Sequence, residues 1–232
     1  MEKQPIRETN YTLIRSNRKT MAIHITREAL VEVRAPLKTV KSDIDRFVQS
    51  KRDWIDKHLA LMENRCKEKS TFTLGYGDTV ALQGCSFPII SKPGDRAGFD
   101  GKCFYLPPGL SSEEIKQAVI QIYRLTAKRL LTNKTVELAK QMNVTPSAVK
   151  INGAKTRWGS CSGKNSINYS WRLMMAEDEA IDYVVVHELA HLKELNHSSR
   201  FWAIVAGVLP DYKAREDKLK KLQKRLVCED WD

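Results

Sequence analysis

The chain has 232 residues, 42% of them hydrophobic, which is enough for a folded core in one large or two small domains. Its formal charge is +11, from 39 basic and 28 acidic residues, and this favours contact with a polyanion such as nucleic acid, although solvated Lys and Arg interleaved with acids also explain it. No apolar run approaches the roughly 20 residues of a membrane span and MEKQPIRETN lacks a signal-peptide core, so we expect a cytoplasmic protein with no membrane partner.

The N-terminal part alternates between strand-like and helix-like periods. From Tyr11 to Pro36 apolar and polar residues alternate, which predicts a small antiparallel sheet of half-buried strands. From about residue 40 to 65 the spacing becomes that of an amphipathic helix with a basic exposed face. Between Phe72 and Pro108, short apolar runs separated by glycines predict further short strands.

A helix start follows this strand-rich part. The sequence SSEE at 111–114 supplies hydroxyls that cap free backbone amides and carboxylates that complement the helix dipole, and the helix should run toward Met142. The proline pair at 107–108 is the best internal boundary. We therefore expect an N-terminal α+β region, residues 1–108, and a catalytic region, residues 109–232.

The catalytic region contains a long apolar run, IDYVVVHELAHL, which ends at Leu192 and predicts a buried helix. His187 and His191 lie four residues apart, so a helix places both imidazoles on one face, close enough to share a zinc ion at about 2.0–2.1 Å. Glu188 points about 100° around the helix. It can therefore reach a metal-bound water without itself binding the metal.

A catalytic zinc site takes a third protein ligand and leaves the fourth position to water. His197 is the leading candidate, because Asn196 tolerates the left-handed conformation that ends a helix and the short connection has a low ordering cost. Glu216, on a later helical stretch, is the alternative. Since three of the five histidines lie between residues 187 and 197, we predict a Zn²⁺ site made by His187, His191 and His197.

The spacing of these histidines matches that of the metzincin proteases, but Glu194 stands at the glycine of their motif and no methionine follows Met175. The chain resembles another family more closely, the YgjP-like metal-dependent hydrolases of bacteria. The resemblance covers nearly the whole chain and lies in the stretches RSNRKTMAIHITREALVEVRAPLKTVKSDIDRFVQSKRDWI, TRWGSCSGKNSINYSWRL and IDYVVVHELAHLKELNHSSRFW.

The resemblance implies a zinc site made by His187, His191 and His197, with Glu188 catalytic. It also implies a core related to the SprT-like and WLM-type proteases, some of which act on proteins attached to DNA. Members of the family have further been described as pyrophosphatases acting on uridine triphosphate. We therefore expect an α+β fold, in which a small strand-rich N-terminal part precedes a zincin-like core with an HExxH helix and an adjacent β-hairpin.

The hairpin is expected between residues 157 and 172, where RWGSCS and INYSWRL flank a turn. An edge strand beside the active helix can pair with an extended peptide. Arg157, Trp158 and Arg172 are candidate substrate-binding residues, because a guanidinium group matches a phosphate or a developing oxyanion. In the alternative reading, Trp158 packs in the core and both arginines form structural salt bridges or bind carbonyls.

These features predict a zinc-dependent hydrolase of the metallopeptidase type, in which Glu188 takes a proton from the metal-activated water and passes it to the leaving group. A nucleotide (UTP) pyrophosphatase using the same zinc site is one alternative, favoured by the basic composition and the two arginines. A nucleic-acid-associated protein with structural zinc is the other, although structural zinc normally has four protein ligands. The substrate, polypeptide or nucleotide, stays open at this point.

Overall fold

The computed structural model describes residues 10–26, 29–70 and 72–231. The chain divides into two compact units, the first comprising Met1–Phe72 with Val227–Asp230 and the second Thr73–Leu226 with Trp231–Asp232. Among the described residues, none of the helices has both the length and the apolar character needed to cross a membrane.

The first unit contains a three-stranded sheet in the order β1-β3-β2, formed by β1 (Thr12–Ser16), β2 (Ala22–Ile25) and β3 (Val31–Pro36). The central strand β3 pairs antiparallel with β2 and parallel with β1. The expectation of a wholly antiparallel sheet is therefore wrong. Since β1 and β2 lie on opposite edges of β3 instead of pairing with each other, β1 and β3 can run in the same direction.

Two helices, α1 (Lys41–Ser50) and α2 (Arg52–Ser70), replace the single helix expected between residues 40 and 65. The helical period is confirmed, but the chain leaves helical geometry at Lys51, where ψ is 13°. Buried residues of both helices and of β3 form one core, made by Val31, Val33, Ala35, Ile44, Val48 and Ile55. Full burial of a Val or Ile side chain stabilises the fold by about 1.5–3 kcal/mol.

The second unit begins with a four-stranded sheet in the order β4-β5-β7-β6, formed by β4 (Thr79–Leu82), β5 (Cys85–Ser91), β6 (Gly98–Phe99) and β7 (Phe104–Leu106). Gln83 and Gly84 form the turn between β4 and β5 at φ angles of 50° and 78°, the left-handed conformation of a tight hairpin turn. The turn packs against the start of the helix that carries the HExxH motif. Gln83 donates from its backbone N–H to the Met174 carbonyl at 2.7 Å and from its side chain to Asp178 at 3.0 Å.

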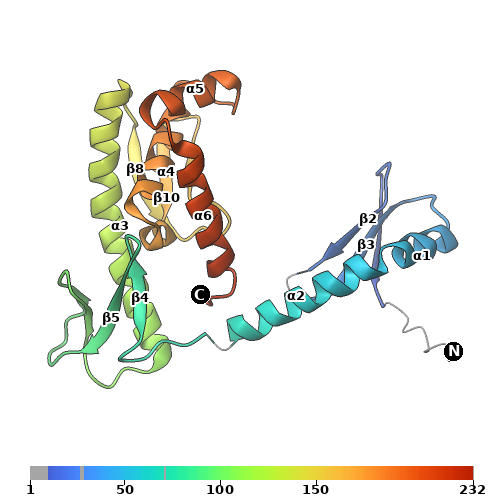
Figure 1. Ribbon diagram of the computed structural model, residues 1–232, viewed down its shortest axis with the longest axis horizontal. Coiled ribbons are helices and arrows are strands. Elements are labelled where there is room, and N and C mark those ends of the chain that lie inside the picture. The colour runs from blue at the N-terminus through green and yellow to red at the C-terminus, as the bar shows by residue number, and fades with distance from the viewer. Residues whose placement is uncertain (1–9, 27–28, 71, 232) are drawn as a thin grey trace. The chain divides into compact units, whose positions relative to one another are not determined.

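The long helix α3 (Ser112–Met142) begins where the sequence predicts. Ser111 and Glu114 form a reciprocal capping box, and Asn143 ends the helix in the left-handed conformation. Figure 1 shows α3 extending along the second unit. It contacts β8, the short helix η1 (Trp171–Met175) and α4 (Asp178–Ala190). The long helix therefore packs directly against α4, the helix that carries the HExxH motif.

The second sheet of this unit has the order β8-β10-β9, formed by β8 (Ala148–Asn152), β9 (Gly159–Cys161) and β10 (Ser166–Ser170). The expected hairpin is present as the antiparallel pair β9–β10. Its second strand is shorter than expected, because the chain turns into η1 at Trp171 after the Ser170 side chain caps that turn. Two further helices complete the unit, α5 (Ser199–Val208) and α6 (Tyr212–Leu226).

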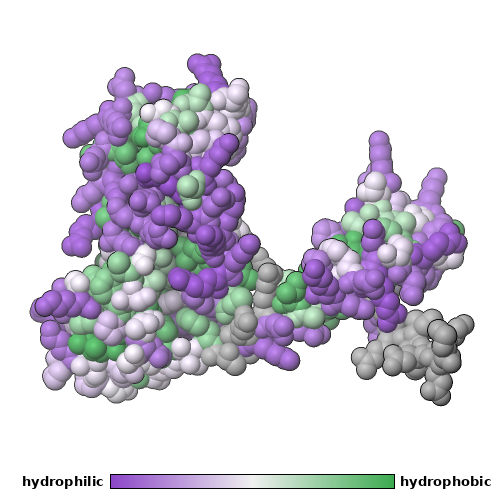
Figure 2. All heavy atoms as spheres, viewed as in Figure 1, coloured by the Kyte–Doolittle hydropathy of each residue, from purple (hydrophilic) through white to green (hydrophobic). Residues whose placement is uncertain are grey.

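The protein therefore has the mixed α+β fold that the sequence predicts. Pro107 and Pro108 lie inside the second unit, in the connection between β7 and α3, so the division at residue 108 into two regions stays a prediction. On the face drawn in Figure 2, hydrophilic side chains gather over α3 and α6, whereas apolar side chains are more frequent over β4 and β5.

Candidate metal centre

The helix α4 carries the HExxH motif through the interior of the second unit. Asp178 and Glu179 lie in its first turn, where carboxylates complement the helix dipole, and most of its later residues are buried. The helix ends at Ala190, slightly earlier than expected, and the backbone N–H of Glu194 donates to the Ala190 carbonyl as the chain turns. This turn brings the following segment back toward the helix.

The three predicted histidines come together at this turn. Ligand-capable atoms of His187, His191 and His197 all lie within 4.8 Å of one another. The Nε2 atoms of His187 and His197 are 3.1 Å apart. Two imidazole nitrogens bound tetrahedrally to one zinc ion at about 2.0–2.1 Å would lie roughly 3.3 Å apart, so the arrangement fits a shared metal ion.

Glu216, the alternative third ligand, is not part of this cluster in the described chain. Its carboxylate lies 3.1 Å from the Lys220 ammonium, one turn further along α6. The geometry therefore favours His197 over Glu216 as the third ligand.

Aromatic side chains hold the histidines in place. Phe201, fully buried, lies 4.9, 4.6 and 4.7 Å from the ring centroids of His187, His191 and His197. His197 is exposed, but its ring stacks on Trp202 at 5.8 Å. This support was not predicted, although the RFW sequence at 200–202, shortly after the third histidine, was a usable signal.

Trp202 is itself supported by Tyr212, on which it stacks at 5.2 Å. Ser198 caps the start of α5, accepting from the Phe201 backbone N–H at 3.3 Å, and so fixes the helix that carries both aromatic residues. A further contact orients His191, whose Nδ1 lies 3.2 Å from the Glu194 carbonyl. Donation from Nδ1 leaves Nε2 free for a metal, which is the usual arrangement of a metal-binding histidine.

Burial favours the neutral form of His187 and His191. Burial, together with the neighbouring His191 and His197, lowers the pKa of His187 to about 3. Burial also lowers the pKa of His191. Neutral imidazole is the form that binds metal ions, and three converging imidazoles suit Zn²⁺ among other divalent metals.

Glu188 is 5% exposed, and its Oε2 atom has no hydrogen-bond partner among the described residues. Burial raises the pKa of this carboxyl to about 7, against a smaller lowering by Arg157. The carboxyl packs directly on β9, where a Cβ atom added to Gly159 would lie 2.5 Å from Glu188 Oε1. A carboxyl with a pKa near neutrality can both accept and donate a proton.

A pocket of about 560 Å³ opens beside Glu188 and His187, lined by the segment before β9, by α4 and by α6. Arg157 and Trp158, two of the predicted substrate-binding residues, line it together with Tyr183. The structure thus brings Arg157 and Trp158 into the same pocket as His187 and Glu188.

Arg172 lies elsewhere. Its buried guanidinium donates to the Gly153 carbonyl at 2.7 Å and to the Trp231 carbonyl at 3.4 Å, and it lies 4.4 Å from the centroid of the Trp171 ring. These contacts favour the structural alternative for Arg172. Asp182, a conceivable partner for a zinc-binding histidine, instead binds Lys134 at 2.6 Å.

The histidine cluster in this α+β fold fits a metallopeptidase domain, and the comparison with known families agrees. The profile of the YgjP-like metallopeptidase domain matches residues 19–222, so the chain belongs to the YgjP-like metallopeptidase family. This confirms the resemblance seen in the sequence.

Two solved structures are similar to parts of the chain. The metallopeptidase zymogen of Pyrococcus abyssi abylysin is 30% identical, with 40% of this chain and 96% of that chain covered and a TM-score of 0.38. The metallopeptidase zymogen of Methanocaldococcus jannaschii jannalysin is 23% identical, with 40% and 95% covered and a TM-score of 0.35. A comparison with curated proteins gave no match.

Proposed function

We propose that this protein is a zinc-dependent peptidase that cleaves extended polypeptide segments. The observation that carries the proposal is the position of β9. This strand is at the edge of its sheet, paired with β10 on one side, and Gly159 at its start packs against Glu188 and lines the same pocket. The free edge of β9 can therefore bind a substrate main chain by strand addition, next to the acid–base group.

The three histidines would hold the metal through converging ring nitrogens, with the Nε2 atoms of His187 and His197 only 3.1 Å apart. When bound, zinc lowers the pKa of a coordinated water to about 7 and polarises a substrate carbonyl. The donor set contains no fourth protein ligand within the cluster of described residues, which is the pattern of a catalytic site.

Glu188 supplies the proton transfers. Its buried carboxyl lines the pocket beside His187, and the ionised form accepts a proton from the attacking water. The same carboxyl then donates that proton to the amine that leaves. Burial against β9 holds the carboxyl in one place, because the Gly159 backbone leaves no room for movement on that side.

The nucleotide pyrophosphatase alternative draws on the same pocket, since Arg157, Lys220 and Lys224 line it and match a phosphate in charge. A nucleotide pyrophosphatase would not use the free edge of β9 to bind its substrate. The alternative with structural zinc leaves unexplained why a buried carboxyl with a raised pKa lies beside the histidines.

Glu188→Gln tests the proposal. Wild-type protein should bind zinc and cleave an unstructured polypeptide such as labelled casein, while Glu188→Gln should keep the zinc and lose about 100-fold or more of the activity. Glu137→Gln makes the same chemical change at an exposed position of α3 and should behave as wild type. Full activity of Glu188→Gln would contradict the mechanism, and release of phosphate from uridine triphosphate without peptide cleavage would favour the alternative.

A further inference from the structure

The pocket beside Glu188 has a basic side that the proposed chemistry does not use. Arg157 comes from the segment before β9, and Lys220 and Lys224 come from α6. The two lysines are four residues apart and so lie on the same face of the helix. Cations therefore border the pocket from two different elements.

A direct contact joins these two elements. The side-chain amide of Gln223, which also lines the pocket, donates to the Lys155 carbonyl at 3.1 Å. This hydrogen bond ties α6 to the segment that carries Arg157. The cations on the two elements are thus held near each other.

The charges on this side are not all neutralised within the protein. Lys220 lies 3.1 Å from both Glu216 and Asp217. In the described part of the chain, neither Arg157 nor Lys224 forms an ion pair with a nitrogen-to-oxygen distance of 4.0 Å or less. Arg157 lines the same pocket as Glu188 and His187, so its charge lies beside the reacting groups.

We propose that the preferred substrate is a polypeptide with an Asp or Glu side chain close to the scissile bond, bound by Arg157 and Lys224. The proposal rests on the peptidase function proposed above. Side chains of a strand alternate between two faces, so a peptide added to β9 directs a defined subset of its side chains toward the α6 side of the pocket. A guanidinium binds a carboxylate through two parallel hydrogen bonds, and a lysine adds a point charge.

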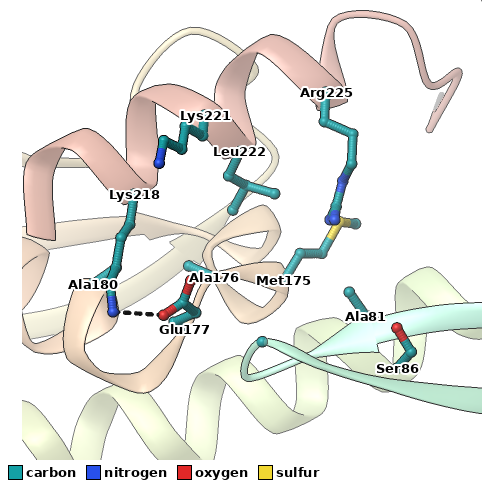
Figure 3. Close-up of a pocket in the computed structure, with 11 residues that line it drawn as sticks. Ala81, Ser86, Met175, Ala176, Glu177, Ala180, Lys218, Lys221, Leu222 and Arg225 are labelled. Carbon is teal, nitrogen blue, oxygen red and sulfur yellow. Dashed lines mark hydrogen bonds and ion pairs between the residues drawn. The ribbon is translucent and has the colours of Figure 1, made fainter.

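The other face of α6 provides a matched control. A second pocket of about 420 Å³ lies there, lined by Lys218, Lys221 and Arg225, and it contains neither Glu188 nor the histidines. Figure 3 shows Lys218 directed at Glu177, with which it pairs at 2.7 Å. Lys221 and Lys224 are both exposed on α6, but they line different pockets.

The experiment uses zinc-loaded full-length protein and a quenched fluorescent peptide of uncharged, unstructured sequence. A single Glu, Gln or Lys is placed in turn at each position around the cleavage site, and kcat/KM is measured. At one or two positions Glu should be cleaved about 3- to 10-fold faster than Gln, with Lys slowest, and the preference should weaken at high salt. Lys224→Glu should abolish or invert this order, while Lys221→Glu should preserve it.

Binding of the same peptides to Glu188→Gln, followed by fluorescence anisotropy, gives a readout that does not depend on turnover, and it should show the same order. Cleavage at equal rates for Glu, Gln and Lys at every position overturns the inference and leaves the peptidase function standing. An equal effect of Lys221→Glu and Lys224→Glu also overturns it, since the effect would then be one of total charge. No cleavage of any peptide overturns the proposed function and the inference with it.

Discussion

Glu188 should make the metal-free protein less stable as the pH rises. Burial raises the pKa of this carboxyl to about 7 in the folded protein, whereas its ordinary value, expected in the unfolded chain, is 4.5. Between these values the folded state holds a proton that the unfolded state has lost. Stability therefore falls as the pH rises through this window, and the full penalty is present above about pH 7.

The size of the effect follows from the two pKa values. At about 1.4 kcal/mol per pH unit, the interval from 4.5 to about 7 corresponds to roughly 3 kcal/mol. In the Glu188→Gln variant, the side chain at position 188 is uncharged at every pH. The variant therefore does not undergo this loss of stability. We expect the metal-free variant to be more stable than wild type by about 3 kcal/mol at pH 8, and the two proteins to differ little near pH 4.

The assay is urea unfolding of chelator-treated protein at a series of pH values. Tryptophan fluorescence reports mainly on the second unit, which contains four of the five tryptophans, Trp158, Trp171, Trp202 and Trp231. Glu137→Gln, at an exposed site, should leave the wild-type pH profile unchanged. A difference between wild type and Glu188→Gln that is constant with pH, or that shrinks as the pH rises, would refute the reasoning.

The remaining predictions concern the metal centre. Gly159→Ala should keep the metal but lower kcat at least about tenfold, because its Cβ would lie 2.5 Å from Glu188 Oε1, and an unchanged kcat would show that the carboxyl has room to move. His197→Ala should lose zinc on dialysis, as metal analysis would show; retention of a full equivalent would make Glu216 the better ligand. Trp202→Ala should weaken zinc binding, measured by competition with a chromophoric chelator, since His197 loses its stacking partner. If the variant binds zinc as tightly as wild type, stacking on Trp202 does not position His197 for the metal. Phe201→Ala should lower the free energy of unfolding, measured in urea, by about 3–5 kcal/mol. A loss below about 1 kcal/mol would mean that packing of the three histidine rings on Phe201 contributes little to stability.

The chemistry of the candidate site was predictable because its main residues are close together in the chain. His187 and Glu188 belong to α4, and His191 caps its C-terminal end with helical backbone angles, so helical geometry determines which of these side chains share a face. His197 follows after a short turn, so few conformations were available to it. The helix start at Ser111 was predictable for the same reason, since a capping box involves only neighbouring residues.

Features that depend on partners far apart in the chain could not be predicted. The sequence offered two readings of Arg172, and only packing against Gly153, Trp171 and Trp231 shows it buried among carbonyls. The parallel pairing of β1 with β3 likewise depends on which strand edges meet, which alternation of apolar residues does not specify.

The sequence by itself determined which residues are candidates for the metal ligands and the acid–base group, because residue type and short spacings along the chain define them. Tertiary structure alone decided how those groups behave. The raised pKa of Glu188 arises from burial against β9, and the basic side of the pocket arises from the approach of α6 to the segment before β9. Both depend on desolvation and on charges brought together across long stretches of chain, and no local pattern of residues encodes them.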